Sequence, residues 1–428
     1  MKWLTESFQT LNKYNQNVRN YILGNLLIQV GMGVFGVMYN LYISELHLGE
    51  TVNGKVISVA SLATAIMLIP AGLLSDKFGR RKMILIGTCC TVFLLFGRSI
   101  VVTEMPMLVF AFAGGIVWAL VQVSGIPFLA ENSRSDERMK LFSFHFALVT
   151  IAGVVGNLLG GIIADAVQYL TPLNAAQSIR VSLLVGVAIF TCGIIPLLKL
   201  KPNVKNEDAK KIEQQKETGK EGSFRFNLKM IALFSFANWL IGTGSGLVIP
   251  YLNLYFANRF DASNSYIGFI LALGSAMTAV AMLIGPALVN KVGKVRALVI
   301  FQLSSIPFLF LTAYTSSLIL ASFGFLMRQA LMNAGNPITS AIAMDVVSDK
   351  YKGLGNSVNQ MVFNIGWATM GVPSMWLVVT FGSYWGYAYA FSITGVLYLI
   401  SSIYFYFVFG RKYALKNELL EQKSAVPK

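Results

Sequence analysis

The sequence predicts an all-α polytopic membrane protein with twelve transmembrane helices in two pseudo-symmetric six-helix halves. Composition, the length of the apolar runs and the distribution of charge lead to this prediction. The chain has 428 residues, of which 55% are hydrophobic and 12% are charged, and its mean hydropathy is +0.63. A helix needs roughly 18 or more apolar residues to cross about 30 Å of hydrocarbon. The chain repeatedly contains runs of that length, which a soluble domain would not need.

Each long apolar run, taken between charged or turn-rich breaks, predicts one span. The first half holds the predicted spans 20–43, 55–74, 83–103, 106–130, 141–164 and 180–198. The second half holds 229–257, 265–289, 297–314, 317–344, 355–380 and 385–409. The residues before the first span are polar and contain no apolar core of a cleavable signal peptide, so we expect the first span to act as the insertion signal.

The net charge of +15 is explained by membrane topology and does not indicate a nucleic-acid partner. If the N-terminus is cytoplasmic, most of the 34 Lys and Arg residues fall in the inner loops, the linker and the tails, as the positive-inside rule requires. The exceptions are Lys55, Arg98, Arg180 and Arg259 near the outer ends of spans and Arg328 in mid-span. Both termini are therefore predicted to be cytoplasmic, and no nucleic-acid partner is expected.

One long polar stretch, which includes "NEDAKKIEQQKETGKE", separates the two sets of spans. Such a charge-rich stretch is typical of a solvated linker. The predicted organisation is an N-terminal six-helix half over 1–198, a cytoplasmic linker over 199–228, a C-terminal six-helix half over 229–410 and a cytoplasmic tail over 411–428.

The two halves are related by an internal repeat. Polar and glycine positions correspond at a constant shift: Asp76 with Asn290, Gly79 with Gly293, Arg80 with Lys294, Glu131 with Asp345, Arg138 with Lys352 and Ser143 with Ser357. The tripeptide Asn-Leu-Tyr at 40–42 recurs at 253–255. Parallel repeats of this kind are typical of transporters that rock around a site near the membrane midplane.

Two patterns that resemble cofactor sites are excluded by their positions. The three cysteines are spread over two spans and form neither a disulfide framework nor a metal-ligand quartet. Gly31, Gly33 and Gly36 match GxGxxG, but inside an apolar helix rather than after a strand, so we expect close helix packing there and no dinucleotide site. The spans also lack clustered catalytic groups, so no enzyme activity, metal or cofactor is expected.

The loop between the second and third spans holds a dense charge cluster, "GLLSDKFGRRK", at residues 72–82. Gly72 is suited to close helix packing and Gly79 to a turn with positive φ, while the bases at 80–82 would anchor the third span on the inner side. Asp76 requires a further explanation, because an acid among inner bases needs a partner such as a neighbouring Arg or a helix N-terminus.

This stretch resembles the signature of the major facilitator superfamily, G-x-L-x-D-x-x-G-R-R/K-K, in the loop where that family carries it. A degenerate second copy, "PALVNKVGKVR", occupies residues 286–296. With the twelve spans and the repeat, the resemblance covers essentially the whole chain. It implies the fold of that family and secondary active transport of a small organic solute by alternating access in the cytoplasmic membrane.

The resemblance also implies a conformational latch on the cytoplasmic side. In the family, the Asp of the motif contacts the start of span 11 across the seam between the halves, and the Arg pairs with an acid at the inner end of span 4. The positions that match the motif and its second copy form the predicted latch: Gly72, Asp76, Gly79, Arg80, Glu131, Asp345 and Lys294.

The resemblance to the drug–proton antiporters of the family is partial. Those antiporters carry G-P-x-x-G-G in span 5, whereas residues 156–161 read "GNLLGG", with Asn157 in place of Pro. They also carry an Arg in the middle of span 4, which this chain lacks. Efflux is the favoured direction, with an uptake permease or a non-transporting membrane receptor or assembly protein as alternatives. Coupling to protons or another ion stays open.

In the family, spans 1, 4, 7 and 10 line the cavity with help from spans 2, 5, 8 and 11. On these spans the polar and aromatic candidates for substrate binding are Asn25, Gln29, Asn40, Trp118, Gln122, Asn238, Trp239, Asn253, Arg328, Gln329, Asn333, Asn359, Asn364 and Trp367. Most are uncharged amides or aromatics, so an amphipathic organic solute is the expected cargo. The lipid bilayer is the other expected partner.

Three basic residues allow more than one interpretation. Arg328, in mid-span without an acid on its own span, either contacts an anionic part of the substrate or is a structural hydrogen-bonding residue. Arg98, on a span that the family turns toward lipid, is expected to snorkel to the outer interface. His145 either titrates during transport or makes an interhelical hydrogen bond.

Overall fold

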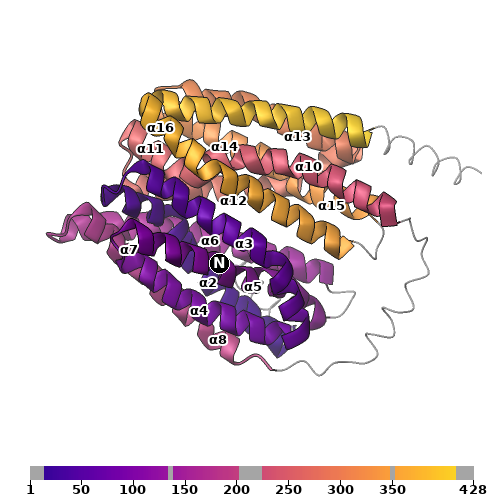
Figure 1. Ribbon diagram of the computed structural model, residues 1–428, viewed down its shortest axis with the longest axis horizontal. Coiled ribbons are helices and arrows are strands. Elements are labelled where there is room, and N and C mark those ends of the chain that lie inside the picture. The colour runs from indigo at the N-terminus through magenta and orange to yellow at the C-terminus, as the bar shows by residue number, and fades with distance from the viewer. Residues whose placement is uncertain (1–13, 134–137, 202–223, 348–351, 411–428) are drawn as a thin grey trace, which may run out of the picture. The chain divides into compact units, whose positions relative to one another are not determined.

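The structure, a computed structural model, describes residues 14–133, 138–201, 224–347 and 352–410. Every regular element in these ranges is a helix, and ten of the described helices are long and apolar enough to cross a membrane (Figure 1). These observations confirm the predicted all-α polytopic membrane fold. The cytoplasmic placement of both termini stays a prediction, and residues 1–13 and 411–428 lie outside the described ranges.

The first half of the chain forms one helix for each predicted span, the last of them divided at Gly193. These helices are α2 (Gln16–Glu45), α3 (Glu50–Phe78), α4 (Arg80–Ile100), α5 (Glu104–Glu131), α6 (Arg138–Leu170), α7 (Ala175–Cys192) and the short α8 (Ile194–Leu198). They extend beyond the predicted spans because polar residues such as those of the 72–82 motif continue the helical turns on both sides of Gly79.

The second half follows the same order with more interruptions. Its helices are α10 (Phe224–Val248), α11 (Leu252–Phe260), α12 (Asn264–Val292), α13 (Lys294–Tyr314), α14 (Leu318–Ala334), α15 (Asn336–Val346) and α16 (Lys352–Phe405). The predicted span 317–344 is divided at Gly335 into α14 and α15, and α16 contains two predicted spans with a bend at Gly382, where φ is 75°. The ten membrane-length helices therefore hold eleven of the predicted spans, and the remaining one, 317–344, is formed by the shorter helices α14 and α15.

The chain forms two compact units. The first comprises residues 1–216 and 251–276, and the second comprises 217–250 and 277–428. The predicted division at the linker differs from these units in residues 251–276, where the start of the second half packs with the first half. The predicted linker lies mostly outside the described ranges, so the domain organisation stays a prediction.

Small residues allow close helix packing in the first unit, where α2 lies against α6 and α7. A Cβ atom at Gly31 would be 2.6 Å from the Gly186 carbonyl oxygen, and one at Gly33 would be 3.0 Å from the Gly156 Cα. The expected role of the glycines on the first span is confirmed for these two. It is wrong for Gly36, where an added Cβ would meet nothing within 4 Å.

In the second unit α10 packs along α16, and α13 packs against α14 and α16. An aromatic cluster fills part of this core: Phe234 of α10 meets Phe405 and Phe409 with ring centroids 5.6 and 5.8 Å apart. Edge-to-face contacts of this kind add to the burial of the apolar rings. They hold the last described residues of the chain against the start of the second half.

Candidate functional site

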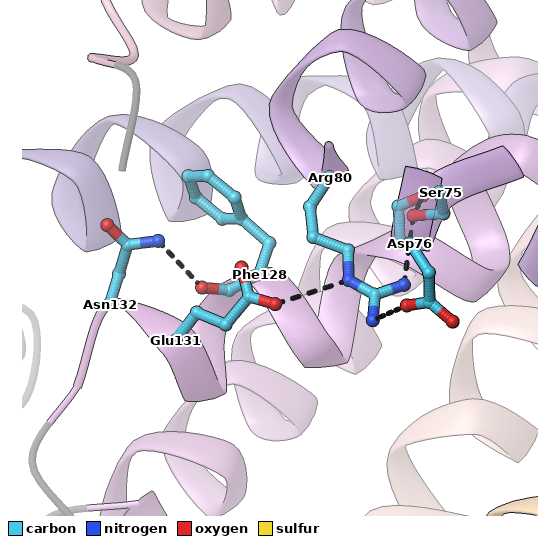
Figure 2. A network of polar contacts seen from close by, with 7 residues as sticks. Ser75, Asp76, Arg80, Phe128, Glu131 and Asn132 are labelled. Carbon is cyan, nitrogen blue, oxygen red and sulfur yellow. Dashed lines mark hydrogen bonds and ion pairs between the residues drawn. The ribbon is translucent and has the colours of Figure 1, made fainter. Parts of the chain in front are cut away.

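A polar junction of the first unit lies where α3 ends and α4 begins (Figure 2). The Arg80 guanidinium is the centre of this junction. Its Nη1 donates to the Ser75 Oγ at 3.1 Å, its Nη2 pairs with the Asp76 carboxylate, and its Nε lies 3.4 Å from the Glu131 Oε1. The expected ion pair between Arg80 and Glu131 is therefore present.

The backbone at Gly79 produces this arrangement. Gly79 has a φ of 93° and a ψ of 139°, so α3 stops there and α4 starts at Arg80. A side chain at such a φ would be strained, whereas glycine adopts it readily. The predicted positive φ is confirmed. Gly293, its counterpart in the repeat, has a φ of 83°, so the same turn recurs between α12 and α13.

The junction is attached to α5 at two points. The Ser75 hydroxyl is fully buried and lies 2.7 Å from the Ser124 hydroxyl of α5, and Glu131 closes the same helix. The Asp76 and Glu131 side chains are 62% and 46% exposed. Each pair is screened by solvent and is worth only about 0–1 kcal/mol. Weak pairs of this kind are suited to contacts that must break and reform.

The other predicted latch residues show fewer of the expected contacts. A Cβ at Gly72 would meet no neighbour within 4 Å, so the expected close helix packing at Gly72 is absent in this structure. Lys294 opens α13 directly after Gly293, as Arg80 opens α4 after Gly79. The side chain of Asp345 lies outside the part that the structure describes, so its pairing with Lys294 stays a prediction.

Two of the predicted substrate residues contact each other near the C-terminal end of α2. The Asn253 amide of α11 donates to the Val37 carbonyl at 2.7 Å, and the Asn40 amide donates to the Asn253 Oδ1 at 3.4 Å. Both side chains are buried, and the two residues correspond in the repeat. They form a helix–helix contact between segments that belong to different halves of the sequence.

A second contact of this type was not foreseen from the sequence. The Ser265 N–H at the start of α12 donates to the Asp165 Oδ2 of α6 at 2.7 Å. A carboxylate at a helix N-terminus accepts free backbone donors and interacts favourably with the helix dipole. The sequence showed Asp165 only as an acid near the end of a predicted span. It could not identify the partner, which lies 100 residues away in sequence.

Arg328 is buried in the second unit, with 4% of its surface exposed. Its Nη2 donates to the Tyr398 hydroxyl of α16 at 2.6 Å, and its Nη1 donates to the Gln329 Oε1 at 3.0 Å. The Tyr398 hydroxyl also lies 2.8 Å from the Ser245 hydroxyl of α10. Across the described residues no carboxylate pairs with Arg328, and its Nε is buried without an acceptor.

The substrate candidates fall into two sets, one in each compact unit. Asn25, Gln29, Asn40, Trp118, Gln122 and Asn253 belong to the first unit, and Asn238, Trp239, Arg328, Gln329, Asn333, Asn359, Asn364 and Trp367 belong to the second. The structure brings together Asn40 with Asn253, and Arg328 with Gln329, whose carbonyl oxygen accepts from the Asn333 amide at 2.9 Å. The substrate-binding set as a whole stays a prediction.

Two more of these side chains hydrogen-bond to protein groups. The Asn359 Oδ1 accepts from the Ser235 hydroxyl at 2.7 Å, and the Asn364 amide donates to the Gln360 carbonyl at 2.8 Å. Trp239 lies beside Phe236, and both are exposed. The buried Nε1 of Trp367 has no acceptor among the described residues.

His145 and Arg98 have aromatic neighbours. The buried His145 imidazole packs against the Tyr21 ring of α2 at 5.8 Å, and no hydrogen bond joins it to another described helix. The Arg98 guanidinium lies 4.0 Å from the Tyr39 ring centroid. Its charged end therefore lies against a buried tyrosine of α2, a contact that the sequence did not predict, and its snorkelling to the outer interface stays a prediction.

Comparison with known proteins agrees with these features. The chain is 25% identical over 364 residues to the MFS-type transporter MJ1560 of Methanocaldococcus jannaschii, covering 83% of this chain and 89% of that protein. It is 25% identical to multidrug resistance protein 1 of Bacillus subtilis, over 46% of this chain and 48% of that protein.

A solved structure of a D-xylose–proton symporter has the same fold. It matches with a TM-score of 0.70 at 15% identity, over 91% of this chain and 97% of that chain. Residues 21–240 and 234–427 each match the family profile. The chain therefore belongs to the Major Facilitator Superfamily and is a polytopic membrane transporter.

Proposed function

We propose that the protein is a secondary active transporter that exports a small organic solute across the cytoplasmic membrane by alternating access. The observation that favours this function is the complete set of contacts around Arg80, with Ser75, Asp76 and Glu131. A transporter that rocks between two states needs weak, reversible contacts at the ends of its helices. A receptor that uses the fold only as an anchor has no need of them.

The proposed cargo is amphipathic. The candidate substrate residues are mostly amides and aromatics, which bind apolar surface and a few polar groups without requiring one charge type. The similarity to multidrug resistance protein 1 of Bacillus subtilis supports efflux of such compounds. The fold shared with a D-xylose–proton symporter keeps uptake as the alternative direction.

Transport in reconstituted vesicles tests the proposal. The purified protein would be placed in liposomes of defined orientation, and movement of a fluorescent amphipathic dye would be followed with and without an imposed proton or sodium gradient. We expect gradient-dependent dye export for the wild type and its loss in Arg80→Gln. The exposed Lys82, two residues along the same helix, provides the matched control Lys82→Gln.

The outcome also distinguishes the alternatives. Movement only in the opposite direction would identify an uptake permease. Saturable dye binding with no gradient-dependent movement in either direction would favour a membrane receptor and contradict the proposal. Loss of transport in both variants would show a general effect of charge in the loop rather than a specific role of Arg80.

A further inference from the structure

Arg98 and Arg180 lie in the first unit at the predicted outer end. Arg98 is in the last turn of α4, the helix that Arg80 begins, so it is at the opposite end of that helix from the Arg80 junction. Both depart from the positive-inside distribution. Neither takes part in the contacts from which the transport function is proposed. Their surroundings indicate a separate role.

Arg98 points into the helix bundle rather than toward lipid. It lies on α4 at a seven-residue spacing from Thr91 and Ile84, both of which are buried. Residues seven apart on a helix share one face. The opposite face carries Ile86, Phe93 and Ile100 at the same spacing, and all three are exposed.

Arg180 likewise lies on the buried face of its helix, α7. It begins a stripe that continues through the buried residues Leu183 and Val187. Its Nε and Nη2 both donate to the Tyr42 hydroxyl oxygen, at 3.1 and 2.9 Å. That hydroxyl donates in turn to the Val101 carbonyl at 3.3 Å, just beyond the end of α4.

The two guanidinium groups contact one pair of tyrosines. Tyr39 and Tyr42 are one turn apart on α2, both are buried, and their ring centroids are 6.4 Å apart. The Arg98 guanidinium carbon lies 4.0 Å from the Tyr39 ring centroid, and that of Arg180 lies 5.6 Å from the Tyr42 ring centroid. The aromatic faces hold both cations near the same end of α2.

These cations have no counter-charge in the described part of the chain. Arg98 makes no hydrogen bond or ion pair there, and its Nε and the neighbouring Tyr39 hydroxyl are buried without partners. Arg180 donates only to a neutral hydroxyl. By contrast, Lys55 at the same end pairs with the Glu104 carboxylate at 2.6 Å. A partly buried cation without an anion is unfavourable.

We propose that Arg98 and Arg180 bind an oxyanion, a carboxylate or phosphate group, beside the Tyr39 and Tyr42 pair. A planar guanidinium presents parallel N–H donors that match two oxygens of such a group. The anion supplies the acceptors that Arg98 lacks and the negative charge that both arginines lack. Because both side chains lie on the buried faces of their helices, the site takes a small soluble anion rather than a lipid headgroup.

Thermal unfolding of the purified full-length protein in neutral detergent tests this site. Inorganic phosphate and acetate would be titrated at constant ionic strength against chloride, and phosphatidylglycerol micelles would be titrated separately. A ligand that binds the folded state raises the unfolding temperature in a saturable manner. We expect such a rise with phosphate or acetate in the wild type.

The variants Arg98→Gln and Arg180→Gln should each weaken oxyanion binding by about tenfold or more, since each removes charge-assisted hydrogen bonds. Lys55→Gln is the matched control and should retain wild-type binding. Arg98→Lys, which keeps the charge, should fold and bind more weakly than the wild type.

Three results would overturn the proposal: no saturable stabilisation of the wild type, wild-type binding in both Gln variants, or stabilisation by phosphatidylglycerol alone. The last of these would identify a lipid headgroup site. The wild-type titration shows whether the folded protein binds an oxyanion, even if Arg98→Gln does not fold.

Discussion

Arg80 shows how a single side chain can connect three helical segments. It contacts Ser75 and Asp76 at the end of α3 and Glu131 at the end of α5, so its loss leaves two carboxylates without their shared cation. Loss of Glu131 leaves Arg80 with Asp76. The two charges of one ion pair are therefore not equivalent.

We predict that Arg80→Gln impairs transport and stability more than Glu131→Gln, and that the double variant loses less than the sum of the two. The expected coupling is about 0.5–1 kcal/mol, because the pair is partly exposed. A double-mutant cycle on unfolding free energy and on initial transport rate measures this coupling. Strictly additive losses would rule out a direct interaction.

Arg328 gives a second prediction at the residue scale. Because its guanidinium donates to Tyr398 and Gln329, we expect Tyr398→Phe and Arg328→Lys each to lower stability by about 1.5–3 kcal/mol without ligand. Remaining transport should keep its substrate preference. Unfolding temperature and transport of one anionic and one cationic substrate check this. Unchanged stability with selective loss of the anionic substrate would instead assign Arg328 to the cargo.

At the scale of helices, a glycine inside α2 is required where the backbone of a neighbouring helix comes close. Gly31 and Gly36 lie on the same helix, but only Gly31 faces the neighbouring α7 backbone. An added methyl group at Gly31 would overlap the Gly186 carbonyl, whereas one at Gly36 has open space. The same substitution at the two positions therefore has different consequences.

Gly31→Ala should destabilise the protein by about 1–3 kcal/mol through overpacking. Gly36→Ala should change stability by no more than about 1 kcal/mol, and in the stabilising direction, because alanine restricts the unfolded chain. Thermal unfolding in detergent compares the two directly. Equal destabilisation by both would show that α2 does not approach α7 as described.

At the scale of the whole molecule, two sets of contacts lie at opposite ends of the first unit. Asp76 belongs to the Arg80 junction, and Asn253 contacts Val37 and Asn40 at the predicted outer end. In alternating access, the contacts at one end break when the protein opens at that end, while those at the other end stay formed. Weakening either end should shift the equilibrium toward the state open at that end.

We predict that Asp76→Asn favours the inward-open state and Asn253→Ala the outward-open state, and that both reduce transport with expression intact. Reporter cysteines introduced in a background without Cys89, Cys90 and Cys192, all free in the native chain, would measure accessibility from each side. Shifts in the same direction, or an unchanged ratio, would contradict opposing roles for the two ends.

The sequence by itself determined the membrane fold, the approximate positions of the spans, the turn at Gly79 and the pairing of Arg80 with Glu131. Each of these depends on local composition, on helical spacing or on a short motif whose partners the family resemblance identifies. It could not determine which side chains far apart along the chain meet. Asn40 and Asn253 stay predicted substrate residues, but the sequence did not predict that they hydrogen-bond to each other, which they do because their helices pack at that end. Arg98 was expected to snorkel to the outer interface, and the sequence did not predict that its guanidinium lies on the Tyr39 ring. The face that a helix buries is set by its neighbours, and tertiary packing alone decided those neighbours.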